Sequence, residues 1–151
     1  MDLSKVKWVV IIAIVLGGGW FLTEGGMNAI YDNATKELPG NDPEKDVIDE
    51  ASLSKYGGFL LSTFRYQKAK VFYTAAIERY GAEGANYYWD VYQLARCEEK
   101  LGNYEQTVIL LRELYNVDGD FYDERVPGRD TLKLRITKLV EMYDLSHLAV
   151  P

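Results

Sequence analysis

Few side chains in this sequence could carry out catalysis or bind a metal. The single cysteine, Cys97, excludes an intrachain disulfide and a cysteine-based zinc cluster. The single histidine, His147, lies in the C-terminal tail with no second ligand near it in sequence. We expect Cys97 to be a small core side chain and His147 to have neither a catalytic nor a metal-binding role.

Carboxylates gather between residues 118 and 124, where oxygen atoms could bind calcium. The ligand order of an EF-hand is missing, so a solvated acidic turn is the favoured interpretation. No apolar run has the two-residue period of a strand, so no glycine loop follows a strand to bind phosphate. We therefore predict that the protein is not an enzyme and has no cofactor or bound metal.

Composition allows one folded domain and argues against one class of partner. The chain has 151 residues, 48% of them hydrophobic, which is enough for a core. Its net charge is −6. An acidic body is unsuited to phosphate backbones, so we expect no nucleic-acid partner.

The apolar run Val6–Leu22 predicts a transmembrane helix. Its seventeen residues reach about 25 Å, slightly less than the ~30 Å of a hydrocarbon core. Lys7 can reach the interface, and Trp8 and Trp20 stand at the two edges, as in an aromatic belt. The run Gly17, Gly18 and Gly19 either allows close packing against another membrane helix or loosens this one.

A cleaved signal peptide is the alternative interpretation, with a basic start and small residues after the apolar run. If the segment is retained, charge sets its orientation. Lys5 and Lys7 stand at the N-terminal end of the run, whereas Glu24 and Asp32 follow it. We therefore expect a single-pass membrane protein with a cytoplasmic N-terminus and a periplasmic or otherwise extracytoplasmic body.

The remaining sequence predicts an all-α protein with four parts: an anchor (1–24), a linker with a short helix (25–42), a helical domain (43–146) and a tail (147–151). A helix break is expected at Gly25-Gly26. Asp42 followed by Pro43 predicts the start of a long helix to about Thr63. Its inward face should carry these residues: Leu53, Tyr56, Gly57, Leu60 and Phe64. Further helices are expected over 66–80 and around Leu132–Tyr143, with an acidic turn over 119–128.

The stretch Tyr88–Asp118 predicts a helical hairpin. Apolar residues recur at spacings of three and four on either side of Leu101-Gly102-Asn103-Tyr104. Gly102 can take the left-handed conformation that ends the first helix, and the Asn103 side chain can cap the second. So short a connection makes the two helices antiparallel neighbours.

Two tandem segments resemble the tetratricopeptide repeat, whose pattern is W-x2-L-G-x2-Y, A-x3-F and P over about 34 residues. The matching positions are Leu53, Tyr56, Gly57, Leu60, Ala69, Tyr73, Ala76 and Gly81, then Val91, Leu94, Ala95, Glu98, Thr107, Leu111, Leu114 and Gly119. The sequence departs from the pattern in three ways: Glu98 replaces a tyrosine, the tryptophan is missing, and the loop between the repeats is longer.

This resemblance implies a solenoid of two helical hairpins with a capping helix, and a concave groove lined by the first helix of each pair. Carried onto the second repeat, the groove-facing stripe is Trp89, Tyr92, Arg96 and Glu99. Aromatic residues and arginine are the usual binding hot spots. Alternatively, Trp89 and Tyr92 pack under the long loop or against the preceding helix.

Two repeats are fewer than the roughly three that a solenoid needs to be stable alone. We therefore expect a membrane-anchored, non-enzymatic accessory or scaffold subunit, whose partners are protein subunits of a membrane complex and the lipid bilayer. The alternative is a transient peptide-binding or chaperone-like module associated with protein export, which requires a free Trp89 stripe.

Overall fold

The computed structural model describes residues 3–150, and all regular secondary structure in that range is helical. The α-helices are α1 (Leu3–Trp20), α2 (Glu24–Ala34), α3 (Pro43–Ser62), α4 (Tyr66–Tyr80), α5 (Tyr87–Lys100), α6 (Tyr104–Asn116), α7 (Gly119–Tyr122) and α8 (Arg129–Met142). Two 3₁₀ turns, η1 (Gly81–Glu83) and η2 (Ser146–Leu148), complete the set. The all-α prediction is confirmed.

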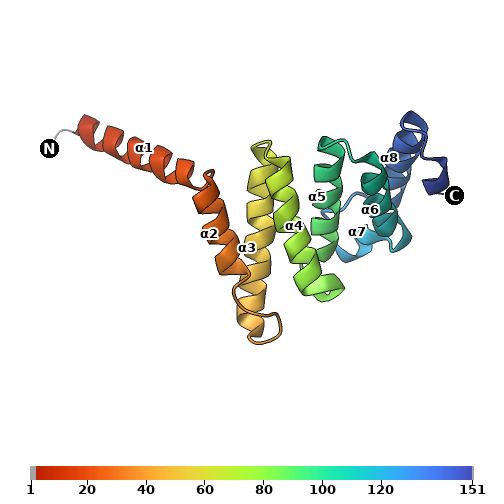
Figure 1. Ribbon diagram of the computed structural model, residues 1–151, viewed down its shortest axis with the longest axis horizontal. Helices are drawn as coiled ribbons and strands as arrows, with labels where there is room; N and C mark the ends of the chain where they lie inside the picture. Colours follow the sequence, from red (N-terminus) through yellow and green to blue (C-terminus); the bar gives the residue numbers. More distant parts are fainter. Residues whose placement is uncertain (1–2, 151) are drawn as a thin grey trace. The chain divides into compact units, whose positions relative to one another are not determined.

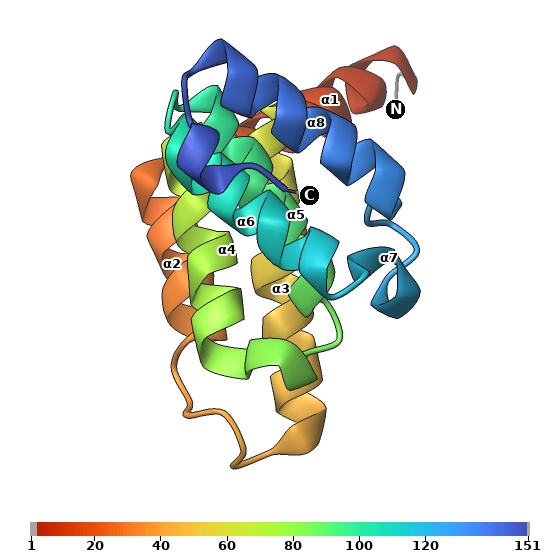
Figure 2. The same ribbon diagram turned by 90° about the vertical axis from the view of Figure 1, so that its right-hand side faces the viewer.

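The chain divides into two compact units, Met1–Lys36 and Glu37–Pro151. In the second unit α3, α4, α5 and α6 stand side by side in chain order (Figure 1). Each packs most extensively on its neighbours in sequence, and α8 packs on α6. The short helix α7 leads from α6 into α8 (Figure 2). The unit is therefore a row of antiparallel helices in which contacts are mostly local.

The core of the second unit is made by the apolar faces of these helices. Its fully or nearly fully buried members include Leu53, Leu60, Phe72, Tyr73, Val91, Val108, Leu111, Leu114, Leu132 and Ile136. Their three- and four-residue spacing is the helix-face pattern read from the sequence. Phe64 was expected among them and is not: it lies beyond the end of α3 and is 78% exposed.

The helix-start prediction at Asp42 is confirmed. The Asp42 carboxylate accepts the backbone N–H of Glu44 at 3.1 Å, and Pro43 opens α3. Gly102 takes the left-handed conformation with φ of +81°. Asn103 stands at the N-cap of α6, but its side chain does not cap the helix. It donates to Glu98 instead, so that part of the hairpin prediction was wrong.

In the first unit, the break between helices falls at residues 21–23 rather than at Gly25-Gly26. The Thr23 hydroxyl accepts the N–H of Gly26 at 3.2 Å and donates to the carbonyl of Trp20 at 2.6 Å. These hydrogen bonds fix the start of α2 at Glu24, one residue before Gly25. A Cβ at Gly26 would lie 2.2 Å from the Trp20 carbonyl oxygen. Glycine is thus needed at position 26 for the bend between α1 and α2, not for a break at its own position.

No single helix among the described residues is both long and apolar enough to cross a bilayer. By length and composition, the bent pair Val6–Trp20 and Glu24–Ala34, at 67° to each other, would be sufficient together. The transmembrane span at 6–22 therefore stays a prediction. Lys7, Trp8, Gly17, Gly18, Gly19 and Trp20 are all exposed along α1.

Two adjacent glycines of α3 give a matched stability test. A Cβ at Gly57 would lie 3.0 Å from the ring of Tyr73, which is fully buried and cannot give way, whereas a Cβ at Gly58 meets only the Tyr73 hydroxyl at 3.4 Å. We expect Gly57→Ala to lower the free energy of unfolding by about 1 kcal/mol through overpacking, and Gly58→Ala to raise it by up to about 1 kcal/mol through helix propensity. Denaturant titration measures both. Equal effects of the two variants would contradict the close α3–α4 approach.

Candidate functional site

The predicted stripe lies on one side of α5, and all four of its residues are half-buried. Two of them contact Arg135 of α8. The Arg135 Nη1 atom donates to the Tyr92 hydroxyl at 3.1 Å, and its Nε atom donates to Glu99 Oε2 at 3.1 Å. This Arg135 bridge ties the last helix to the side of α5 that was expected to be open.

Trp89 is covered in a similar way from the loop after α7. The guanidinium of Arg125 lies 5.1 Å from the centre of the Trp89 ring, in a cation–π contact. Hydrogen bonds hold Arg125 there: its Nε atom donates to the Asp123 carboxylate at 2.9 Å, and its Nη2 atom donates to the Asn86 side-chain oxygen, also at 2.9 Å. The residue that covers Trp89 thus comes from the loop after α7, whereas the alternative prediction named the longer loop between the two repeats.

Arg96 of the stripe lines a hollow beside α3. Its Nη1 atom donates to the Gln93 side chain at 2.8 Å, and no carboxylate pairs with it among the described residues. The hollow, about 300 Å³ in volume, lies between the C-terminal ends of α3 and α5. We call it the α3–α5 hollow. Its lining is Gly58, Leu61, Ser62, Phe64, Tyr66, Gln93, Arg96 and Lys100. This surface combines two aromatic rings with two cations.

Phe64 occupies an unfavourable backbone conformation at the rim of this hollow. Its φ is +63°, in the left-handed region that favours glycine, and helices usually end with glycine at this place. The backbone N–H of Arg65 donates to the Leu60 carbonyl at 2.9 Å, which closes the helix around it. A bulky residue in this conformation costs roughly 1–2 kcal/mol. The Phe64 ring meets the Tyr66 ring edge-on, with the ring centroids 6.2 Å apart. A strained, exposed aromatic of this kind contributes little to folding.

Buried carboxylates on and around α5 position the site. Glu50 of α3 accepts the backbone N–H of Asn86 at 2.7 Å and that of Ala85 at 3.1 Å, and so caps the start of α5. The Ser54 hydroxyl donates to Asp90, which is 1% exposed, at 2.5 Å. Burial raises the pKa of Asp90 from 3.8 to about 7, and the nearby Glu50 charge adds to this.

Glu98 joins the two hairpins at the other end of α5. It is 3% exposed and forms an ion pair with Lys70 of α4 at 2.7 Å. Asn103, in the α5–α6 turn, donates to the same carboxylate at 2.6 Å. The glutamate that departs from the repeat pattern is thus a buried joint between three helices. We call it the Glu98 joint.

The residues with catalytic or metal-binding chemistry do not come together. Cys97 is buried, and burial raises the pKa of its thiol to about 12, so the thiol stays protonated. His147 lies 3.4 Å from Glu105 at an exposed position. Among the described residues, no group of three or more potential ligands could hold a metal ion.

Comparison with known proteins finds no relative: no family model, no curated protein and no solved structure matches the chain. The tetratricopeptide resemblance therefore stays a hypothesis that rests on the residues themselves.

Several residues of the site were not found from the sequence. Arg125 and Arg135 follow the end of α5 at Lys100 by 25 and 35 residues, and no periodicity links them to it. Phe64 had one usable signal, because it stands just past the predicted end of a helix, at Thr63. Lys100 had a similar one, as a basic residue in the last turn of α5.

The Asp90 environment predicts a pH dependence of stability. Because the folded protein holds this proton more tightly than the unfolded chain, the free energy of unfolding should fall as pH rises from about 4 to about 7, by roughly 4 kcal/mol at most. Asp90→Asn keeps the shape and the Ser54 hydrogen bond but removes the titration, so it should flatten this decline. Urea melts at several pH values measure the slope. An exposed control, Asp120→Asn, should leave it unchanged; an unaltered slope in the Asp90 variant would refute the assignment.

Proposed function

We propose that the protein is a membrane-anchored, non-enzymatic interaction subunit that binds a protein partner of a membrane complex through the α3–α5 hollow. The observation that carries the proposal is Phe64. It is 78% exposed and held in a left-handed conformation beside Arg96 and Lys100. Strained residues that do not help folding concentrate at functional sites.

The chemistry of the hollow supports a protein partner. Phe64 and Tyr66 give aromatic surface, and Leu61 lies beneath them as a nearly buried apolar floor. Arg96 and Lys100 add two positive charges in a protein of net charge −6. Aromatic residues with arginine are the types that dominate binding hot spots.

The contacts of the stripe favour a permanent subunit of a complex over a module that binds peptides transiently. A transient module needs Trp89, Tyr92 and Glu99 free for a passing segment. These three side chains are already in contact with Arg125 or Arg135 of the protein itself. Displacing these arginines would cost cation–π and charge-assisted contacts before any peptide is bound.

The row of helices also supports this function. Two antiparallel hairpins and α8 follow one another in chain order, as a tetratricopeptide-like solenoid with a capping helix would. In such an array each hairpin buries its faces only against neighbours, so short arrays leave surface for a partner.

The anchor is proposed from the apolar character of α1. Large apolar side chains stay exposed along it, among them Val9 at 66% and Val15 at 65%, with Trp8 at 64% near its start. A lipid bilayer is the environment in which such a helix is stable. The charge bias across it favours a body on the extracytoplasmic side.

Alkaline carbonate extraction tests the anchor. We expect the intact 151-residue chain to stay in the membrane pellet, and a variant without residues 1–22 to move into the soluble fraction. Recovery of a shorter, soluble chain from the unmodified gene would show instead that the segment is a cleaved signal peptide.

Phe64→Gly separates binding from folding. Glycine adopts the left-handed conformation freely, so the free energy of unfolding should rise by up to about 1 kcal/mol. The same variant should lose the higher-mass complex on a blue-native gel of mildly solubilised membranes, because the aromatic contact is gone.

The matched control is Leu134→Ala, which removes a side chain that is 72% exposed on α8, away from the hollow. It should leave the complex intact. Migration of the unmodified protein as a free monomer, or an unchanged complex in Phe64→Gly, would contradict the proposal.

A further inference from the structure

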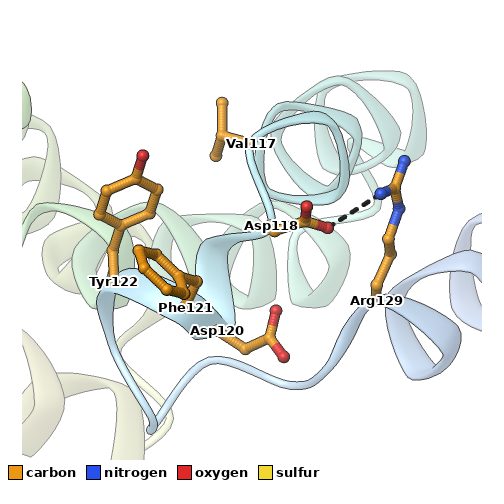
Figure 3. A pocket seen from close by; sticks show the side chains of 6 residues that line it. All are labelled: Val117, Asp118, Asp120, Phe121, Tyr122 and Arg129. Atoms are coloured by element: carbon orange, nitrogen blue, oxygen red, sulfur yellow. Dashed lines mark hydrogen bonds and ion pairs between the residues drawn. The ribbon is translucent and has the colours of Figure 1, made fainter.

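We propose that a second surface, around α7, binds an arginine-bearing segment of a partner protein. This α7 surface is formed by Val117, Asp120, Phe121 and Tyr122 and borders a hollow of about 470 Å³ (Figure 3). It lies beyond the start of α5, whereas the α3–α5 hollow lies at the end of that helix. It is therefore a site additional to the proposed function.

Two aromatic rings of this surface face solvent. Phe121 is 83% exposed and Tyr122 is 60% exposed. Their centroids lie 5.3 Å apart with the planes at 88°, so each presents a differently oriented face. Figure 3 shows the Phe121 and Tyr122 rings on one side of α7 and the Asp120 carboxylate turned toward the side of Arg129, all of them at the same hollow. Apolar surface and a negative charge thus line one hollow.

The backbone that carries these rings is fixed in place. Tyr122 stacks on Tyr88 of α5, with centroids 4.7 Å apart and planes at 14°. Asp118 takes a left-handed conformation, with φ of +51°, and its carboxylate accepts from Arg129 Nη1 at 3.0 Å. A Cβ at the buried Gly119 would meet Leu114 at 3.1 Å, so this turn is also closely packed. Phe121 is consequently presented by a preorganised turn, which lowers the cost of binding.

Charge identifies the occupant. Five acidic and two basic residues lie between Asp118 and Asp130, which gives a local net charge of −3. Arg129 is engaged by Asp118 and by the Tyr115 ring at 4.5 Å, whereas no described residue forms a hydrogen bond or an ion pair with Asp120. A cation from outside would find two aromatic rings and the unpaired Asp120 carboxylate, in a hollow that the Asp118–Arg129 ion pair also lines. Anionic lipids and nucleic acids would be repelled.

Arginine fits this surface better than lysine does. Its planar guanidinium can stack on an aromatic face while it pairs with a carboxylate, which the compact ammonium of lysine does less well. The described residues already include three such contacts: Arg125 over Trp89, Arg129 over Tyr115 and Arg135 over Tyr92, each arginine also paired with a carboxylate. The α7 surface offers the same arrangement with the arginine supplied by a partner.

The test uses the full chain in neutral detergent with ¹³C-labelled Phe and Tyr, titrated with a dye-labelled hexa-arginine peptide. We expect the Phe121 and Tyr122 ring resonances to shift, and hexalysine to bind more weakly. By fluorescence anisotropy, Phe121→Ala should raise the Kd at least about threefold, as the loss of an exposed cation–π contact implies. Asp120→Asn should also raise it.

Glu124→Gln is the charge-matched control, because it removes one negative charge from the same segment outside the hollow. It should change the Kd much less than Asp120→Asn does. Three results would overturn the proposal: equal weakening by these two variants, an unchanged Kd in Phe121→Ala, or ring shifts that follow protein concentration without peptide. The last would identify a second copy of the chain as the occupant.

Discussion

The arrangement of the second unit depends on the contacts of the buried carboxylates on and around α5. At one end of α5, Glu50 caps the helix and Ser54 bonds to Asp90. At the other, the Glu98 joint links α4 to the α5–α6 turn through Lys70 and Asn103. A buried charge is costly unless it is paired, so these contacts fix the register of one hairpin on the next more strictly than apolar packing would. Both proposed surfaces depend on that register.

The helices were predictable because the residues that determine where each helix forms and begins are close together in the sequence. Apolar spacing and the Asp42 cap gave α3 to within one residue, and the hairpin turn at Gly102 was correct. Phe64 was misplaced because its spacing continues the inward face of α3, while the helix ends before it. Spacing describes a face only while the helix lasts. The break near Gly25 was likewise misplaced, because Thr23 caps α2 ahead of the glycines.

The site was less predictable because it is built from distant parts of the chain. The predicted stripe residues lie on one side of α5, and the side chains that cover Trp89 and Tyr92, those of Arg125 and Arg135, come from later parts of the chain. Long flexible side chains of this kind leave no periodic signal. The resulting division gives a covered region around Trp89 and an open region around Arg96. This division leads us to propose the α3–α5 hollow, rather than the whole stripe, as the contact surface.

Site-specific photocrosslinking in native membranes tests this central claim most directly. A photoreactive residue in place of Phe64 should give one discrete adduct with a membrane protein, while the same residue in place of Leu134, which is also well exposed, should give none. No adduct from position 64, or the same adducts from both positions, would contradict the claim that the hollow is where this protein meets its partner.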